Sequence, residues 1–301
     1  MKTRPGFWMG IYLLLAGQLV QAQVKVFACE PEWEALAREI GGEQVKADSA
    51  TTGLQDVHHI EARPSLIARV RQADLLICTG AGLESGWLPI LQRRANNPRV
   101  QTGAPGYMEM ANHVELLGRP ARVDRAAGDV HANGNPHIQL DPRNLVIIAK
   151  ALAQRLAEID PQHAQNYEEG LAGFLDRWQS ALDRWGEQAQ SLQGLPIVVH
   201  HDSWPYLNYW LGLRQVGTLE PKPGVPPTSA HLSQMLKQLQ QQPAAVIIRS
   251  PYQSARPTEW LSERAEIPAM ELPTTVGGNK AATDLFGLFD DIVQQLLSVA
   301  P

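Results

Sequence analysis

The sequence lacks several features that would each mark a class of protein. It has only two cysteines in 301 residues, and they do not form a Cys-x-x-Cys pair, so that zinc and redox motif is excluded. Lys and Arg number 26 against 31 Asp and Glu, giving a net charge of −5, and no basic stripe runs along the chain. We therefore expect no nucleic-acid partner.

Common catalytic signatures are also missing. The chain contains neither a His-Glu-x-x-His helix motif nor a Gly-x-Ser-x-Gly elbow. Gly80-Ala81-Gly82 is too short for a dinucleotide fingerprint, and we interpret it as a turn after a strand. We expect the protein not to be an enzyme.

Long apolar runs are absent except near the N-terminus. Lys2 and Arg4 precede a mostly apolar run over residues 7–20, which is too short to span a bilayer comfortably. Small residues within positions 20–22 suit cleavage, so we expect residues 1–22 to be a signal peptide and the mature protein to be periplasmic. No cysteine stands at the cut, which argues against a lipid anchor. An uncleaved membrane anchor is the alternative.

Export would place both cysteines in an oxidising compartment. Cys29 ends an apolar run over residues 24–28, and Cys78 ends another over residues 74–77. If these runs are neighbouring strands of one parallel sheet, their ends lie close enough for a disulfide. Two buried thiols are the alternative, and the geometry decides between them.

Short apolar runs alternate with helical stretches in residues 23–159 and again in residues 193–301. This alternation predicts an α/β fold with a doubly wound parallel sheet in each part. Residues 160–192 instead follow a helical period, with an apolar stripe at spacings of three and four: Tyr167, Leu171, Phe174, Trp178, Leu182 and Trp185. We predict two α/β lobes joined by one long rigid helix.

One histidine lies on a stiff segment just before a predicted helix. Pro136 restricts Asn135 to an extended conformation, and Asp141 followed by Pro142 is typical of a helix N-cap and first helical residue. His137, between these two points, is therefore held well enough to serve as a metal ligand. A hydrogen-bonded loop histidine is the alternative.

Two more histidines occupy similar loops. His58 precedes a helix that begins at Pro64, and His201 follows the apolar strand predicted at residues 195–199. Open α/β sheets bind ligands beyond the carboxyl ends of their strands. Neutral imidazoles that converge from separate rigid elements suit Zn²⁺. We predict that His58, His137 and His201 are its ligands.

Residues 105–135 form an irregular stretch rich in glycine and charge. A loop of this length is usually functional or mobile. His131 lies near its end, and we interpret it as an ordinary loop histidine, with auxiliary metal capture as the alternative.

These motifs resemble those of the zinc and manganese solute-binding proteins of ABC transporters, of the cluster A-I zinc type, over essentially the whole mature chain. An Asp-x-His-x-x-Glu-x-x-Pro-Ser pattern is matched by Asp56, His58, Glu61, Pro64 and Ser65. The more specific Asn-Pro-His-x-x-Leu-Asp-Pro pattern is matched by Asn135, Pro136, His137, Leu140, Asp141 and Pro142. A His-Asp-x-aromatic pattern is matched by His201, Asp202 and Trp204.

The resemblance implies a monomeric protein that captures Zn²⁺ between two lobes and delivers it to the membrane permease of an ABC importer. Manganese-type members carry a glutamate at the third position, so His201 implies zinc. A zinc hydrolase is one alternative, since three histidines plus water also form a catalytic arrangement. A binder of a chelated metal or organic ligand, with structural histidines, is another.

The sequence departs from the family pattern near its C-terminus. Many members place an aspartate in a Leu-Asp-Pro-Leu-Gly pattern after a C-terminal strand, whereas residues 272–277 here contain no carboxylate. The fourth ligand is therefore open between water, Glu271 and a group from a mobile loop. We expect acids such as Glu61 or Asp202 to orient the imidazoles.

Overall fold

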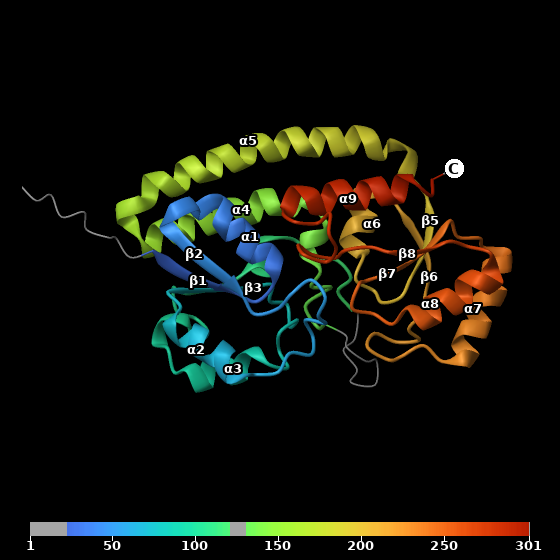
Figure 1. Cartoon of the computed structure of the whole chain (residues 1–301), viewed down its shortest axis with the longest axis horizontal. Coiled ribbons are helices and arrows are strands. Elements are labelled where there is room, and N and C mark those ends of the chain that lie inside the picture. Colours follow the sequence, from blue (N-terminus) through green and yellow to red (C-terminus); the bar gives the residue numbers. More distant parts are fainter. Residues whose placement is uncertain (1–22, 121–130, 301) are drawn as a thin grey trace, which may run out of the picture.

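The computed structural model describes residues 23–120 and 131–300 (Figure 1). The expected signal peptide over residues 1–22 lies outside these ranges. Within them, no helix is both long and apolar enough to span a bilayer.

The first lobe is built on a four-stranded parallel sheet in the order β2-β1-β3-β4. Its strands are β1 (Val24–Ala28), β2 (Val45–Ser49), β3 (Leu75–Cys78) and β4 (Tyr107–Glu109). Its helices are α1 (Pro31–Gly41), α2 (Pro64–Gln72), α3 (Leu88–Ala95) and α4 (Pro142–Ile159). All four residues of β3 are buried, as expected for a strand covered on both faces by helices.

The second lobe repeats this arrangement, with a parallel sheet in the order β6-β5-β7-β8. Its strands are β5 (Pro196–Val199), β6 (Arg214–Thr218), β7 (Val246–Arg249) and β8 (Ala269–Glu271). Its helices are α6 (Pro205–Leu211), α7 (Ser229–Gln241), α8 (Ala255–Ala265) and α9 (Leu285–Leu297). The predicted fold of two parallel-sheet α/β lobes is confirmed.

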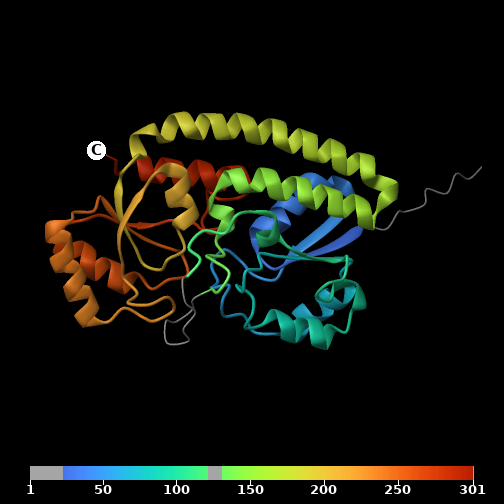
Figure 2. The ribbon, with the colours of Figure 1, turned by 180° about the vertical axis from the view of Figure 1, so that it is seen from behind.

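Helix α5 (Ala164–Gln188, 25 residues) runs along one side of both lobes (Figures 1 and 2). The predicted stripe faces inward, and Tyr167, Phe174, Trp178 and Trp185 are buried on it. The last helix, α9, lies beneath α5 between the lobes, and its Phe289 ring packs 5.2 Å from that of Trp185. Each buried aromatic ring stabilises this layer by roughly 2–3 kcal/mol. The helix predicted to join the lobes is confirmed.

Short 3₁₀ turns complete the chain. They are η1 (Gly42–Gln44), η2 (Pro98–Val100), η3 (Met110–His113), η5 (Ile138–Leu140), η6 (Pro161–His163) and η7 (Ala189–Leu192). Strand β4 and turn η3 lie within residues 105–135, so that stretch is more regular than its composition indicates.

Hydrogen bonds tie the two lobes together at the carboxyl ends of their sheets. Asn135 donates its side-chain amide to the carbonyl of Asp202 (2.7 Å), and the hydroxyl of Tyr206 donates to the carbonyl of Asn135 (2.8 Å). The side-chain amide of Gln139 donates to the carbonyl of Thr274 (3.2 Å). These contacts fix the segment that carries His137 against the second lobe.

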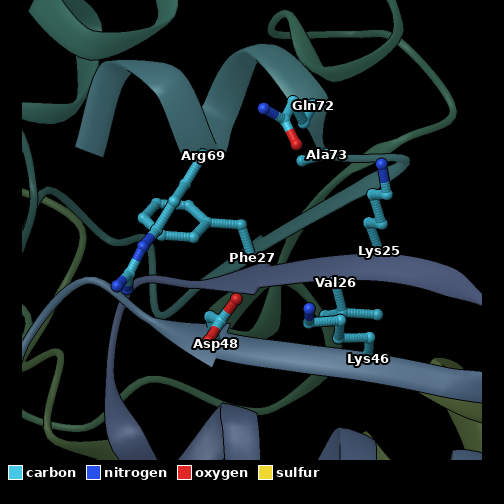
Figure 3. Close-up of a pocket in the computed structure, with 8 residues that line it drawn as sticks. All are labelled: Lys25, Val26, Phe27, Lys46, Asp48, Arg69, Gln72 and Ala73. Carbon is cyan, nitrogen blue, oxygen red and sulfur yellow. The ribbon is translucent and has the colours of Figure 1, made fainter. Parts of the chain in front are cut away.

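A separate hollow of about 90 Å³ lies on the face of the first sheet, beside α2 (Figure 3). Lys25 and Phe27 of β1, Lys46 and Asp48 of β2, and Arg69 of α2 line it. It opens on the faces of the strands rather than at their carboxyl ends, so it is not part of the histidine site described below.

Candidate metal centre

The local backbone around His137 follows the sequence prediction. The side chain of Asp141 accepts a hydrogen bond from the backbone amide of Arg143, with Pro142 as the first residue of α4. On the other side, the side chain of Asn135 accepts one from the backbone amide of His137 (3.0 Å). His137 is thus held between two side-chain caps and is buried, with 5% of its surface exposed.

His58 is oriented by the aspartate two residues before it. The Oδ1 atom of Asp56 contacts both the backbone nitrogen of His58 (3.0 Å) and its Nδ1 (2.8 Å). Burial raises the pKa of Asp56, but the hydrogen bonds and charge of His58 outweigh it and hold that pKa below its ordinary value. The Nε2 atom of His58 is left buried with no hydrogen-bond partner.

His201 has an equivalent partner from a distant part of the chain. Its Nδ1 lies 2.7 Å from Oε2 of Glu220, which also accepts a hydrogen bond from the backbone amide of Gly224 (2.8 Å). Burial lowers the pKa of His201, yet the hydrogen bond to Glu220 raises it above the ordinary value overall. Such carboxylate–histidine pairs fix the ring orientation and raise ligand basicity at metal sites.

The three histidines meet between the lobes. Their ring centroids are 5.7 Å (His58–His137), 5.6 Å (His58–His201) and 6.0 Å (His137–His201) apart. One nitrogen of each lies within 4.8 Å of the other two. Donor atoms around a tetrahedral zinc are about 3.4 Å apart, given Zn–N bonds of about 2.0–2.1 Å, so these nitrogens are spaced somewhat more widely than in an occupied zinc site.

The electrostatics of His137 suit a metal ligand. Its burial, followed by the nearby imidazoles of His58 and His201, lowers its pKa well below the ordinary value. Its Nε2 is buried without a hydrogen-bond partner. A neutral imidazole with an unsatisfied nitrogen is what a divalent cation requires, because the ligand must bind in its deprotonated form.

The prediction that Glu61 or Asp202 orients the imidazoles is wrong. The acids that contact the imidazoles are Asp56 and Glu220 rather than Glu61 and Asp202, and the side chain of Asp202 instead accepts from Gln215 (3.1 Å). The role of Asp56 could be predicted from the sequence, because Asp56 lies two residues before His58. Nothing in the spacing indicated Glu220.

Residues 272–277, which lack the aspartate of the family pattern, form hydrogen bonds with the first lobe. Thr275 donates its hydroxyl to Glu32 of α1, and the carbonyl of Thr274 accepts from Gln139. Glu271 pairs with Arg249 (2.5 Å) at the ends of β8 and β7. That ion pair engages the carboxylate considered as a fourth ligand.

The order of the strands decides whether Cys29 and Cys78 form a disulfide. Strands β1 and β3 are parallel neighbours, and Cys29 and Cys78 follow or end them. The two residues form a disulfide, with their Cα atoms 4.8 Å apart. The bond joins the ends of the two central strands of the first lobe.

Comparison with known proteins identifies the family. A family model described as "ZnuA: Zinc-uptake complex component A periplasmic" matches residues 26–299. The chain belongs to this ZnuA family. The predicted resemblance to metal-binding proteins of ABC transporters is therefore confirmed.

Curated relatives of this ZnuA family member carry names of both metals. The manganese ABC transporter substrate-binding lipoprotein PsaA of Streptococcus pneumoniae is 25% identical over 241 residues, which cover 77% of this chain and 74% of that protein. The high-affinity zinc uptake system protein ZnuA of Brucella abortus (strain 2308) is 25% identical over 115 residues, covering 38% of this chain and 34% of that protein.

Solved structures show the same fold. A crystal structure of ZnuA superposes with a TM-score of 0.78 at 21% identity, covering 93% of this chain and 100% of that one. A Mn-bound periplasmic metal-binding protein from Candidatus Liberibacter asiaticus gives a TM-score of 0.73 at 13% identity, with coverage of 93% and 100%. The family match and the curated relatives place this chain in the family of metal ABC transporter substrate-binding proteins, whose members here are transport proteins and not enzymes, as predicted.

Proposed function

We propose that the protein binds Zn²⁺ through His58, His137 and His201 and delivers it to the membrane permease of an ABC importer. The observation that carries this proposal is that one nitrogen from each imidazole, two on the first lobe and one on the second, lies within 4.8 Å of the others. Residues from both lobes must therefore act together to hold the ion.

The donor set favours zinc over manganese. Imidazole suits Zn²⁺, whereas Mn²⁺ is better served by carboxylate, carbonyl and water oxygens. The group of donor atoms formed by His58, His137 and His201 contains three imidazoles and no carboxylate. The carboxylates Asp56 and Glu220 stand behind the rings, where they offset the charge of the ion without contacting it directly.

Capture and release proceed by local movement. Helix α5 packs along both lobes, which we assign to residues 23–159 and 193–301, and a long buried helix resists wide hinge bending. Loops that carry the histidines therefore adjust around the ion. We further propose that the chain is exported by a cleaved signal peptide over residues 1–22 and acts in the periplasm as a monomer.

A calorimetric titration tests the proposal. Metal-free protein is titrated with Zn²⁺ and, separately, with Mn²⁺, alongside His201→Gln and the exposed control His113→Gln. We expect one zinc per chain, weaker manganese binding, and a zinc affinity that falls at least tenfold in His201→Gln only. Tighter binding of Mn²⁺ than of Zn²⁺, or an unaltered His201→Gln variant, would contradict it.

A further inference from the structure

A fourth histidine, His131, borders the cluster. It belongs to the segment that leads into the His137 motif. Its carbonyl accepts a hydrogen bond from the backbone amide of Gly134 (3.2 Å). The next residue, Asn135, donates its own backbone amide to the carbonyl of Leu117 (2.8 Å). This short turn places the His131 ring beside the site.

The ring of His131 lies as close to that of His58 as the rings of the three predicted ligands lie to one another. Its centroid lies 5.5 Å from that of His58, compared with 5.6 Å between His58 and His201. It also contributes to lowering the pKa of His137, after burial and the other two imidazoles. His131 therefore adjoins at least two of the proposed ligands.

Two hollows converge on this ring. One of about 420 Å³ is lined by His58 and His131, and another of about 140 Å³ is lined by His131, His137 and His201. The Nε2 atom of His131 is buried. Its Nδ1 lies 3.6 Å from the point where a side chain on Gly82 would begin, and the positive φ of Gly82 (90°) also favours glycine there.

The protein groups near the expected fourth position are engaged elsewhere. Glu271 is paired with Arg249, and the segment around Thr274 and Thr275 is bonded to the first lobe. The acids nearest the rings, Asp56 and Glu220, contact the Nδ1 atoms and so lie behind the imidazoles. An imidazole is thus the best-placed protein group for the fourth position.

We propose that His131 is the fourth ligand of the transported ion, an inference that rests on the proposed zinc-binding function. Its donor atoms fall outside the group that lies within 4.8 Å, so its turn moves inward when the ion binds. The result is a site of four neutral nitrogen donors, in which Asp56 and Glu220 offset the charge of the ion. Four nitrogen donors would strengthen selection against Mn²⁺, which prefers oxygen.

The experiment compares His131→Gln with His113→Gln, which changes an exposed histidine from the same region. Zinc binding is measured by calorimetry, and the number of imidazoles bound to the ion is counted by X-ray absorption spectroscopy of the zinc-loaded protein. We expect four imidazoles in the native chain and in His113→Gln, three in His131→Gln, and a zinc affinity at least tenfold lower in His131→Gln. All three proteins should bind one zinc per chain.

Two results would overturn the assignment. Three imidazoles in the native chain, with equal affinity in His131→Gln, would remove His131 from the site while leaving the zinc-binding function intact. A second zinc per chain that disappears in His131→Gln would make it part of an auxiliary site. Failure of the native chain to bind zinc would instead reject the proposed function itself. Equal thermal unfolding of the metal-free variants establishes that any loss is not a folding defect.

Discussion

The carboxylate of Glu32, on helix α1 of the first lobe, accepts a hydrogen bond from the hydroxyl of Thr275 on the second lobe. Glu32 is buried, with 2% of its surface exposed, and it belongs to a group of buried acids that includes Glu30 and Glu84. Burial raises the pKa of Glu32 to about 7, and that of Glu84 likewise to about 7. A contact between the lobes is therefore coupled to protonation.

The pH dependence of stability follows from the direction of these shifts. Between its ordinary pKa of 4.5 and its folded-state pKa of about 7, Glu32 binds more protons in the native protein than in the unfolded chain. The contribution of Glu32 to the free energy of unfolding is therefore fully present below about pH 4.5 and is lost as pH rises through about 7. We expect Glu32→Gln to reduce this slope and to be more stable than the native protein above pH 7 by roughly 1–3 kcal/mol.

Urea unfolding at a series of pH values measures this effect. Glu34→Gln is the matched control, because Glu34 lies on the same helix but pairs with Arg38 at the surface. The control should keep the native slope. Identical slopes for Glu32→Gln and the native protein would show that Glu32 does not titrate in this range.

The central strands and the histidine positions were predictable from the sequence because each has a strong local cause. Strands β1, β3, β5 and β7 are predominantly apolar runs at the centres of their sheets. Pro136, Asp141 and Pro142 fix the backbone of the segment before α4. Each of them acts on residues no more than two or three positions away, so its effect can be read from the sequence.

Features that depend on long-range contacts were missed. Strands β4 and β6 lie at sheet edges, and β6 has only Val216 buried, so neither produces a clear apolar pattern. Glu220 reaches His201 from 19 residues away through a proline-rich loop, and no spacing rule predicts that. The disulfide depends on β1 and β3 being neighbours in the sheet, which the sequence alone does not determine.

Glu220 provides a test of how the imidazoles are oriented. Glu220→Gln removes the carboxylate from Nδ1 of His201 while keeping the size of the side chain. We expect zinc affinity to fall about 10–100-fold, because such partners fix the ring and increase its basicity. Calorimetry measures the change against Glu259→Gln, an exposed glutamate of α8. An unchanged affinity would mean that the ring is positioned by packing alone.

The disulfide between Cys29 and Cys78 should contribute substantially to stability. It closes a loop with a sequence separation of 49 residues, and it joins two strands at the centre of the first lobe. Replacing both cysteines with alanine should lower the free energy of unfolding by roughly 2–4 kcal/mol. Denaturant unfolding measures this loss. Adding a reductant should destabilise the native protein but leave the double variant unchanged, and an equal response in both would contradict the prediction.

Two glycines of α5 make a matched pair that tests the contact between this helix and the first lobe. A Cβ on Gly170 would lie 2.2 Å from the carbonyl oxygen of Ile40 in α1, whereas a Cβ on Gly173 would meet nothing within 4 Å. Gly173→Ala should therefore stabilise the protein by up to about 1 kcal/mol, because alanine is the better helix former. Gly170→Ala carries the same propensity gain but forces α5 away from α1, and it should destabilise by about 1–3 kcal/mol. Thermal unfolding of both variants separates the two effects. Equal stabilisation by both substitutions would mean that α5 does not pack closely against α1, and the argument that it restrains the lobes would lose its basis.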